Sequence, residues 1–423
     1  MRKALLVGAL FSTATLTFAT NGDNLIGLTP ASRGMGGIGV GMPVGPVDSV
    51  FRNPAWMSTM ENKFTVQFGG ILFMPKVKAK MDVPAAMGYT TGEKKSKADL
   101  FTVPEIGIVH RLSDRLVFGL GAFGVSGMGV DYRNARDAGG NIVFNGMHTT
   151  FQFMRIIPAV AFQVNDMISV SGAIHGAWGS LDMGQGQSQT LGLGAQVGAS
   201  LNFGDFLYAG LTYQTPVSMT YKRVFDFDCY SSGGCDGIYE DFKLEQPQEL
   251  AFGVGAAPLN GLKVGLDLRW IDWKNAKGYK KFGWKSQWVV ALGAEYKPME
   301  KLSLRAGWNY GKTPIRGKNL TGAVAQTFNS SGGGVPFTDD MLAFFNLVGF
   351  PAITEQHLTL GAGYEFTNTF SIDVSYVRAF EKKVTSSGFC PGLTGSMSGG
   401  PYNCSISAKN AQDSISIGAS WRF

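Results

Sequence analysis

The sequence predicts an all-β fold, a transmembrane antiparallel β-barrel of about 14 strands with an amino-terminal hatch, or plug, inside its lumen. Three observations predict it: a two-faced final strand, a secretory amino terminus without a later spanning helix, and short turns that alternate with long loops. In residues 414–423 side chains point to opposite faces in turn, and the apolar face comprises Ile415, Ile417, Ala419, Trp421 and Phe423. A terminal aromatic residue is typical of the last strand of bacterial outer-membrane barrels, although an edge strand of a soluble sheet would alternate in the same way.

The amino terminus has the layout of a removed secretory signal over residues 1–19. Met1-Arg2-Lys3 is a short basic head, the residues up to Phe18 are mostly apolar and small, and Thr17-Phe18-Ala19 offers the small residues that a signal peptidase needs. No later stretch reaches the roughly 18 apolar residues of a spanning helix. A secreted chain without such a helix can still cross a membrane if every backbone group is paired in a closed barrel.

The composition favours many strands and excludes nucleic acid as a partner. Of the 423 residues, 58 are Gly, 12% are aromatic and only 16% are charged, whereas about 25% charged residues is usual. The formal charge of +6 is small for this length and the basic residues are scattered. Nucleic-acid binding would require a concentrated basic patch.

The four cysteines form two close pairs in the sequence, Cys229 with Cys235 and Cys390 with Cys404. In an oxidising compartment such pairs most simply predict two loop disulfides. Metal binding is the weaker alternative because no His or acidic cluster lies near either pair. The sequence indicates no cofactor.

Fourteen strand candidates follow one another from Lys63 to the carboxyl terminus. Short turns such as Ser113-Asp114 and Thr367-Asn368 alternate with long polar or Gly-rich connections. This layout is typical of an outer-membrane barrel whose two chain ends lie on the periplasmic side. We therefore expect residues 63–423 to form a barrel with long extracellular loops in the bacterial outer membrane. The candidate strands are 63–74, 100–112, 115–132, 147–164, 166–180, 190–203, 206–222, 245–257, 262–274, 285–297, 301–311, 355–366, 369–382 and 412–423.

The two faces of a strand are distinct in residues 262–270. Even-numbered positions are apolar, while Lys263, Asp267 and Arg269 share the other face. The charged face should line the interior, since Lys or Arg facing lipid at mid-depth costs about 2–4 kcal/mol. Ordinary strand packing would explain some of the aromatic residues near strand ends. Others are expected at the membrane interface, among them Trp270, Trp273, Trp284 and Trp288.

Residues 20–62 lack strand periodicity and are predicted to form the hatch. The interior of a barrel of about 14 strands is too wide for its own side chains to fill, so it must be a water channel or be plugged. Gly34, Gly36 and Gly39 match the dinucleotide-binding spacing, but that motif needs a preceding buried strand, and residues 28–32 make a poor one. Tight backbone turns explain these glycines better.

The hatch segment also carries the most specific local motifs, Ser32-Arg33-Gly34-Met35-Gly36-Gly37, Ser49-Val50-Phe51-Arg52 and Asn53-Pro54-Ala55. In these motifs, and in residues 157–162, 211–217, 304–310, 350–353 and 357–364, the chain resembles the FadL-type long-chain fatty acid transporters of Gram-negative outer membranes. This family includes TodX-like hydrocarbon channels. The resemblance covers nearly the whole mature chain and rests on the order and spacing of the motifs. It assigns Gly34, Gly36, Gly37, Asn53, Pro54 and Ala55 to the hatch motif.

The resemblance implies a monomeric barrel that binds an apolar ligand in an extracellular groove and passes it to a lumenal pocket. Release would follow a hatch movement, through a lateral opening made by an inward kink of the third strand. In residues 118–132 the alternation blurs after Ala122, and glycines permit a bulge. A Gly-rich strand that accommodates a bulky neighbour is the alternative. The candidate kink residues are Gly124, Ser126, Gly127 and Gly129. Residues 42–48 depart from the small and acidic residues that are frequent in the family's hatch.

The predicted function is passive uptake of hydrophobic compounds, with long-chain fatty acids ahead of aromatic or alkane hydrocarbons. A carboxylate ligand favours a nearby cation, and Arg155 shares the polar face of the fourth strand with Gln163, so it should point inward. Residues 337–350 are nearly all apolar in an outward loop, which predicts an exposed interaction patch. The alternative is a loop helix packed into the barrel mouth, which is compatible with ligand binding. The candidate ligand-binding residues are Arg155, Phe151, Phe153, Phe344, Phe345, Leu347 and Phe350.

Two other classes of function have less support. A polar-solute porin would need an open charged constriction and no hatch. An outer-membrane enzyme would need a catalytic group, yet none of His110, His148, His175 and His357 has a Ser or acidic residue at a spacing that demands catalysis. The expected partners are the hydrophobic ligand, outer-membrane lipid and lipopolysaccharide, and the barrel-assembly machinery through the final strand with Phe423.

Overall fold

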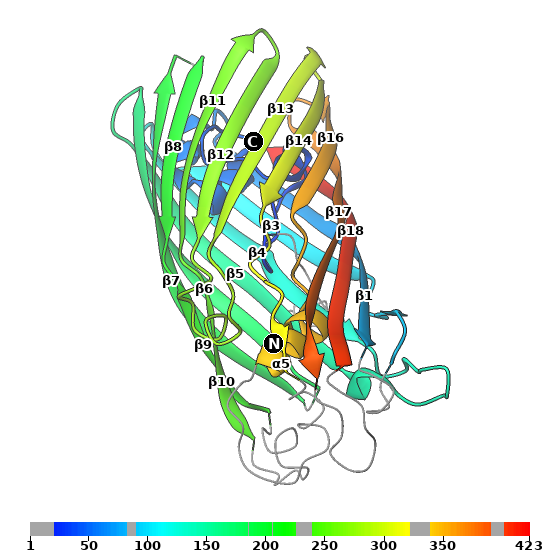
Figure 1. The fold of residues 1–423 in the computed structure, drawn as a ribbon. Coiled ribbons are helices and arrows are strands. Elements are labelled where there is room, and N and C mark those ends of the chain that lie inside the picture. The colour runs from blue at the N-terminus through cyan, green and yellow to red at the C-terminus, as the bar shows by residue number, and fades with distance from the viewer. Residues whose placement is uncertain are drawn as a thin grey trace, which may run out of the picture.

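The computed structural model describes residues 21–82, 90–184, 186–204, 206–225, 239–321, 339–390 and 402–423. Within them the chain forms a closed antiparallel barrel with a plugged lumen (Figure 1). The main sheet contains 16 strands. Two of these have only two residues each, so 14 strands form the wall, as predicted. The predicted signal, residues 1–19, lies outside the described residues.

Each wall strand pairs with its neighbour along the chain, and the last strand pairs with the first to close the barrel. The wall strands are β1 (Phe64–Asp82), β3 (Phe101–Arg111), β4 (Leu116–Asp131), β5 (His148–Gln163), β6 (Ile168–Asp182), β7 (Gln187–Phe203), β8 (Leu207–Gln214), β11 (Glu249–Leu259), β12 (Leu262–Ile271), β13 (Gln287–Met299), β14 (Leu302–Gly311), β16 (Gln356–Thr367), β17 (Phe370–Cys390) and β18 (Tyr402–Arg422). The short strands β2 (Lys94–Lys95) and β15 (Asn319–Leu320) add to β1 and β17 at their outer ends.

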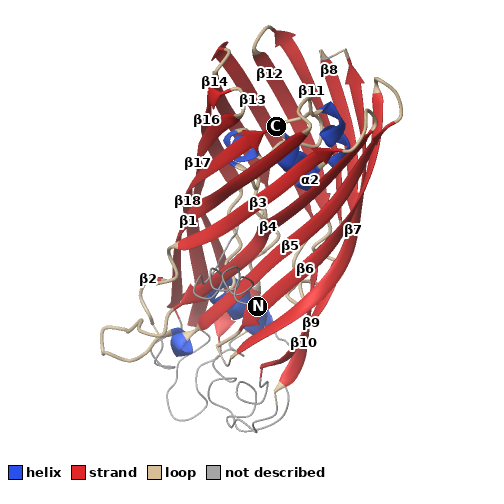
Figure 2. Cartoon of the chain, turned by 180° about the vertical axis from the view of Figure 1, so that it is seen from behind, coloured by secondary structure: helices blue, strands red, loops and turns tan. Residues whose placement is uncertain are grey.

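The wall is taller on one side than on the other. Strand β8 has 8 residues and β12 and β14 have 10 each. Strands β1, β17 and β18 have 19, 21 and 21 residues. Figure 2 shows the taller wall, which includes β5, β6 and β7. Because the short turns all lie at the end that holds the carboxyl terminus, the extra height projects on the side of the long loops (Figure 1).

Two predicted strands are interrupted by proline. We expected continuous strands at 206–222 and 245–257, but the wall strands stop at Gln214 and begin again at Glu249. Between them a separate hairpin, β9 (Val217–Phe225) with β10 (Glu240–Gln246), pairs only with itself. Pro216 and Pro247 stand at the two junctions, where a residue without a backbone N–H ends a ladder of hydrogen bonds. The hairpin therefore leaves the wall and packs across the inner face of β6 and β7.

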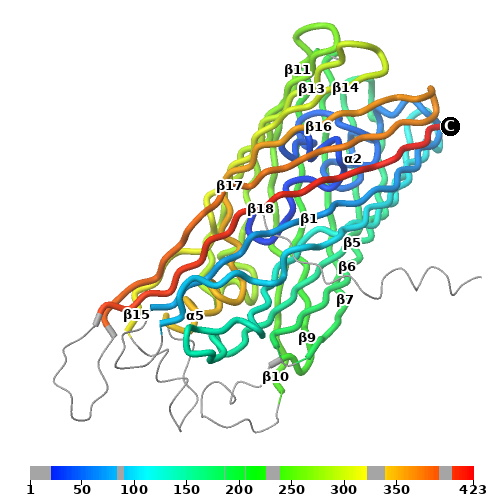
Figure 3. Tube along the Cα trace, turned by 90° about the vertical axis from the view of Figure 1, so that its right-hand side faces the viewer, coloured from blue at the N-terminus to red at the C-terminus, as the bar shows by residue number. Residues whose placement is uncertain are grey.

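Residues 21–62 lie inside the barrel, as expected for the hatch (Figure 3). They form α1 (Pro30–Gly34), α2 (Pro46–Arg52) and the 3-10 helix η2 (Pro54–Thr59). Each of these three helices begins with proline, which is pre-organised for the first helical position. The side chain of Asn53 accepts a hydrogen bond from the Ala55 amide (3.2 Å) and so caps η2.

Outside the lumen, short helices cover the mouth of the barrel: η4 (Phe144–Gly146), α5 (Asp339–Phe344) and the π-helix η5 (Phe345–Gly349). The side chains of α5 and η5 are largely buried, so the prediction of an exposed apolar patch at 337–350 is wrong and its alternative, packing into the mouth, is confirmed. Residues 337 and 338 lie outside the described residues. No described helix is long and apolar enough to cross a membrane.

The outer surface of the wall is apolar and the lumen carries most of the polar side chains. Phe68, Leu72, Ile156 and Leu360 are among the exposed apolar residues, as expected for contact with lipid. Two aromatic residues were assigned wrongly to the interface. Trp273 and Trp284 are buried in the loop between β12 and β13, because that loop turns into the mouth of the barrel.

Candidate functional site

The predicted kink is present in β4. Its side chains alternate until Phe123 and are then continuously buried as far as Val130. Pairing with β3 ends at Phe123 opposite Glu105, and the register with β5 shifts between Gly124 and Ser126. Strand β4 therefore turns inward at the expected residues and separates from the outer part of β3. Its role as a lateral opening stays a prediction.

Hatch residues pair with the edge of β4 that is no longer paired with β3. The Leu25 amide donates to the Val125 carbonyl (3.0 Å), and the Gly127 amide donates to the Asp23 carbonyl (3.1 Å). The Ser126 hydroxyl also donates to the Asn24 side chain. These contacts extend the sheet by a few hatch residues at the kink, so movement of the hatch would expose this edge.

A buried polar cluster holds this end of the hatch. The carboxylate of Asp23 accepts hydrogen bonds from the Tyr279 hydroxyl and from Gln246 Nε2 (3.3 Å). The Ser126 hydroxyl reaches Gln246 Oε1 (3.2 Å). Burial raises the pKa of Asp23 to about 7, while the hydrogen bonds from Tyr279 and Gln246 act in the opposite direction. Asp23 thus links the hatch to the loop between β12 and β13 and to β10.

That loop reaches the cluster through three aromatic rings, those of Trp273, Tyr279 and Trp284, which pack edge-to-face or tilted against one another. Their ring centroids are 4.6–5.2 Å apart. Trp284 Nε1 donates to Asn346 Oδ1 (2.9 Å), and Asn346 Nδ2 donates to the Phe282 carbonyl (2.8 Å). The aromatic cluster therefore joins the Asp23 contact on one side to the π-helix η5 on the other.

An apolar crevice lies against this aromatic cluster. Its polar groups, Asn346 and the Trp284 N–H, are already hydrogen-bonded to each other, so the crevice presents apolar surface. It holds only about 10 Å³ of free space, enough for about one water, so a ligand must displace side chains to enter. The lining residues are Met128, Phe151, Leu181, Met183, Phe242, Leu244, Phe282, Trp284, Asn346 and Phe350.

A wider groove at the outer rim leads toward the crevice, and the two share Met183. The groove has a volume of about 270 Å³ and combines apolar walls, such as Phe144 and Met147, with the polar side chains of Arg133, His148 and Asp182. Arg133 Nη2 pairs with Asp131 (2.8 Å). The groove therefore offers polar and apolar surface side by side, whereas the crevice below is apolar.

On the far side of the hatch, a polar vestibule of about 670 Å³ faces the short turns. It is lined by hatch residues, including Val44, Trp56 and Asn62, and by wall residues such as Lys263 and Arg422. The hatch thus separates an apolar crevice on the loop side from a polar vestibule on the other side.

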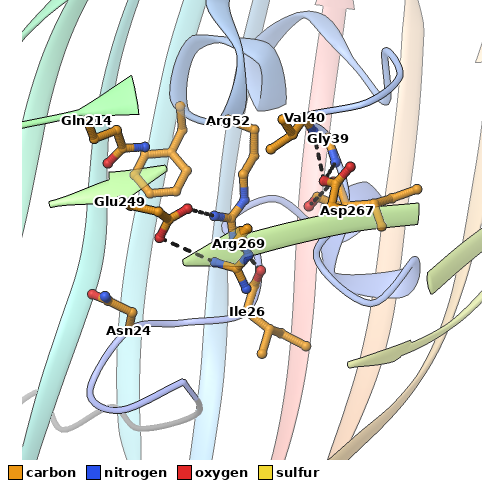
Figure 4. Close-up of polar contacts among 12 residues, drawn as sticks. Asn24, Ile26, Gly39, Val40, Arg52, Gln214, Glu249, Asp267 and Arg269 are labelled. Atoms are coloured by element: carbon orange, nitrogen blue, oxygen red, sulfur yellow. Dashed lines mark hydrogen bonds and ion pairs between the residues drawn. The ribbon is translucent and has the colours of Figure 1, made fainter. Parts of the chain in front are cut away.

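The hatch is held to the wall by charged side chains (Figure 4). Asp267 on β12 accepts hydrogen bonds from the amides of Gly39 (2.8 Å), Val40 (2.8 Å) and Gly41 (2.9 Å). Glu249 on β11 lies between two guanidinium groups, at 3.7 Å from Arg52 of the hatch and 3.7 Å from Arg269 of the wall. The sequence placed Asp267 and Arg269 in the interior, and they do line the lumen.

Other predicted hatch residues also make close contacts. Arg33 donates to Ser416 (3.0 Å) and Ser414 (2.5 Å) of β18 and to the Gly27 carbonyl (3.0 Å). Gly36 and Gly37 have φ of +70° and +81°, which favour glycine. A Cβ at Gly37 would lie 1.9 Å from the Ile26 carbonyl oxygen.

Arg155 points inward, as predicted, but is already bonded within the wall. Its Nη1 donates to Gln214 Oε1 (2.6 Å) and lies 2.9 Å from His175 Nδ1. The guanidinium also stacks over the Phe153 ring, 5.3 Å from the centroid. A contact between Arg155 and a ligand stays a prediction.

Of the remaining candidate ligand residues, Phe151 and Phe350 line the crevice and Phe153 does not. Phe344, Phe345 and Leu347 are buried in α5 and η5, and the Phe345 ring lies 6.5 Å from the ring of Phe282, which lines the crevice. Cys404 takes part in a disulfide, but the side chain of Cys390 and the whole of Cys229 and Cys235 lie outside the described residues, so both pairings stay predictions. The described residues contain no group of three or more His, Cys, Asp or Glu that could hold a metal ion.

Sequence reasoning missed two elements of the crevice, the β9–β10 hairpin and the loop between β12 and β13. Pro216 and Pro247, which lie inside the strand candidates 206–222 and 245–257, could have indicated the hairpin. The spacing of Trp273, Tyr279 and Trp284 could have indicated an aromatic cluster.

Comparison with known proteins agrees with this architecture. A family model described as outer membrane protein transport protein (OMPP1/FadL/TodX) matches residues 29–185. No curated protein sequence gives a significant match.

Three solved structures illustrate the similarity of fold. A FadL homologue from Pseudomonas aeruginosa has a TM-score of 0.67 at 17% identity, covering 95% of this chain and 100% of that one. The toluene transporter TodX of P. putida gives 0.65 at 15%, covering 94% and 99%. The toluene transporter TbuX of Ralstonia pickettii gives 0.60 at 18%, also covering 94% and 99%.

Proposed function

The resemblance to the OMPP1/FadL/TodX family is confirmed over residues 29–185, and from this premise we propose that the protein is a passive uptake channel for hydrophobic compounds. Its location is the bacterial outer membrane. The apolar crevice inside a plugged barrel carries the proposal, because a pore for polar solutes would have no use for such a site. Family members are transport channels, and we propose no catalytic role.

The ligand's route begins in the groove at the outer rim and continues past Met183, which the groove and the crevice share, into the crevice. A hydrophobic molecule gains about 0.8 kcal/mol for each buried CH₂, so the crevice can draw it through the polar outer layer of the membrane without an energy source. Entry requires movement of Trp284 or Phe282, because the crevice is nearly closed.

Release would occur at the β4 kink. Displacement of Trp284 disturbs Tyr279, which contacts it, and thereby the hydrogen bond between Tyr279 and Asp23. Since Asp23 and Leu25 pair with the freed edge of β4, weakening this bond would let the hatch leave the edge. The ligand could then pass between β3 and β4 into the membrane.

The ligand class follows from the charges around the crevice. No cation is among the described lining residues, and Arg155 is engaged by Gln214 and His175. We therefore place uncharged aromatic or alkane hydrocarbons first. A long-chain fatty acid is the second candidate, because its carboxylate could remain at Arg133 and His148 of the groove while its chain enters the crevice.

Ligand retention by the purified, refolded barrel tests the proposal. The protein is incubated with equal amounts of toluene, decane, oleate and a small sugar, washed, and analysed by mass spectrometry. Leu181→Trp fills the crevice, whereas Leu193→Trp makes the same change on the exposed outer face of β7. We expect retained apolar ligand to fall about tenfold only for Leu181→Trp, which corresponds to the loss of about two buried CH₂ groups at about 0.8 kcal/mol each. No retention of any apolar compound would refute the channel.

Two further features accompany the proposal. We propose that the barrel is a monomer, and that the assembly machinery recognises the final strand. Phe423 is exposed although its backbone pairs with Phe64 (2.8 and 3.0 Å), so its ring remains accessible where β1 and β18 close the barrel.

A further inference from the structure

The outward face of β1 changes character halfway along the strand. Even-numbered residues point outward, as their alternating exposure shows. From Phe64 to Met74 this face is apolar apart from Gly70, and it continues as Lys76, Lys78 and Lys80. The change from apolar to cationic side chains indicates the depth at which β1 leaves the hydrocarbon region of the membrane.

The register of the sheet brings further cations to the same level. Lys78 lies opposite Lys409 of β18, which lies opposite Lys383 of β17. Arg378 of β17 lies opposite Asp413, which in turn lies opposite Met74. We call Lys76, Lys78, Lys80, Arg378, Lys383 and Lys409 the basic seam. Figure 3 shows that β17, β18 and β1, which carry it, run side by side where the chain closes.

The carboxylates at the basic seam balance only part of its charge. Asp413 lies 3.0 Å from Lys76 Nζ and 2.6 Å from Arg378 Nη1. Glu93 lies 3.1 Å from Lys78 Nζ and 2.7 Å from Lys409 Nζ. Each of these carboxylates is therefore shared by two cations.

Two more acids complete the surroundings. Asp82 pairs with Lys80 at 2.7 Å, and Glu381 acts on Lys409 electrostatically. Six cations thus face four carboxylates, and the difference is two positive charges. Lys95 beside the seam is neutralised by Asp99 at 2.7 Å.

The described residues of β5, β6 and β7 do not repeat this pattern. On β5, β6 and β7 the outward side chains stay apolar far along the strands, as at Ile156, Ile174, Leu191 and Leu193, which are 55–75% exposed. The basic seam is therefore a local surface and not a ring that all outer-membrane strands share.

We propose that the basic seam binds the phosphate groups of a lipid A molecule in the outer leaflet. Its acyl chains would lie along the apolar face directly below, against Phe68, Leu72 and Ile417, all exposed. Lysine and arginine side chains bind phosphate oxygens through charge-assisted hydrogen bonds, and their attraction to anionic lipid is strongest within a Debye length of the surface. The inference rests on the outer-membrane location and is independent of the transported ligand.

Such a lipid would brace the place where the barrel closes. Strands β1 and β18 come from opposite ends of the chain and are joined only by hydrogen bonds and side-chain contacts. A lipid that contacts Lys76 and Lys78 of β1, Lys409 of β18 and Lys383 of β17 would link three strands across this closure.

The test compares two triple variants that each remove three positive charges. Lys76→Gln, Lys78→Gln and Lys383→Gln leave Asp413 with Arg378 and Glu93 with Lys409. The control variant, Lys274→Gln, Lys280→Gln and Lys281→Gln, changes exposed residues of the loop between β12 and β13. Bound lipid is counted by native mass spectrometry of refolded protein with bis-phosphorylated lipid A, with the same lipid after removal of both phosphates, and with inorganic phosphate as competitor.

We expect the seam variant to lose lipid A binding about tenfold, the control to stay within about twofold, and the dephosphorylated lipid to bind equally weakly to all three proteins. Equal binding of lipid A by the seam variant and the wild type, or equal binding of the two lipids by the wild type, would overturn the proposal. Complete displacement by inorganic phosphate would reassign the site to free phosphate. If the seam variant does not fold, salt titration of the wild type decides, because binding that does not weaken with salt contradicts a phosphate contact.

Discussion

Substitution of Asp267 by Asn should loosen the hatch. Asp267 accepts three backbone hydrogen bonds, from Gly39, Val40 and Gly41 at 2.8–2.9 Å. The Asn side chain keeps the shape but has only one acceptor oxygen and two N–H donors. At least one hatch amide would then face another donor.

The magnitude follows from these three bonds. Hydrogen bonds to charged groups contribute about 1.5–3 kcal/mol each, and a buried N–H left without an acceptor costs about 1–3 kcal/mol. The carboxylate is buried, so part of this gain is already offset by the cost of removing its charge from water. We expect the hatch to be destabilised by about 2–4 kcal/mol, which corresponds to a roughly 30- to 900-fold rise in the population with these amides open.

Amide hydrogen exchange at residues 39–41 measures this population directly. Asp373→Asn is the matched control, because Asp373 is also on the inner wall but pairs with Arg305 of β14 (2.5 Å). We expect exchange at Gly39–Gly41 to accelerate strongly in Asp267→Asn and to stay near wild type in Asp373→Asn. Acceleration of less than about threefold in Asp267→Asn, or equal acceleration in both variants, would refute the view that Asp267 anchors the hatch.

Three further predictions concern the same segment. Gly37→Ala should destabilise the hatch, since its φ is +81° and a Cβ would lie 1.9 Å from the Ile26 carbonyl oxygen; unchanged thermal unfolding would contradict this. Tyr279→Phe removes a hydrogen bond to Asp23 and should accelerate hydrogen exchange of the Leu25 amide about five- to tenfold. Equal exchange in the variant and the wild type would contradict the proposal that the aromatic cluster controls release of the hatch. Burial raises the pKa of Asp23 to about 7, so the engaged hatch binds more protons than a released one between about pH 4 and 7 and should loosen as pH rises through that window. Asp23→Asn should reduce this pH dependence, measured as amide hydrogen exchange of the hatch corrected for the intrinsic exchange rate at each pH. The pH dependence that remains would come from Asp48, whose pKa burial also raises to about 7.

The positions of the wall strands could be predicted because their signals are local. Alternation in 262–270 and a short turn such as Thr367-Asn368 depend on neighbouring residues alone. The β4 kink was also predictable, since the loss of alternation after Ala122 and the glycines that follow are visible in the sequence. The structure has the register shift between Gly124 and Ser126.

The candidate site was predictable only in part. The contacts of Arg155 with Gln214 and His175 could not be predicted, because these residues lie on three different strands. The apolar loop at 337–350 could not be assigned to solvent or to the barrel mouth, since its burial depends on Trp284 and Phe282, more than 50 residues away in the chain.

The sequence by itself therefore determined the barrel, its hatch and the location of the kink, because period-two patterning, turn residues and glycine positions act over a few residues. The tertiary structure alone decided where the β9–β10 hairpin and the loop with Trp273 and Trp284 go, and thus which side chains line the crevice. It also decided that Lys78, Lys409 and Lys383 form one surface, because the register between the first and last strands is set by closure of the barrel. Contacts of this kind join residues that are distant in the chain, and their free energy depends on the packed lumen as a whole and not on any single segment.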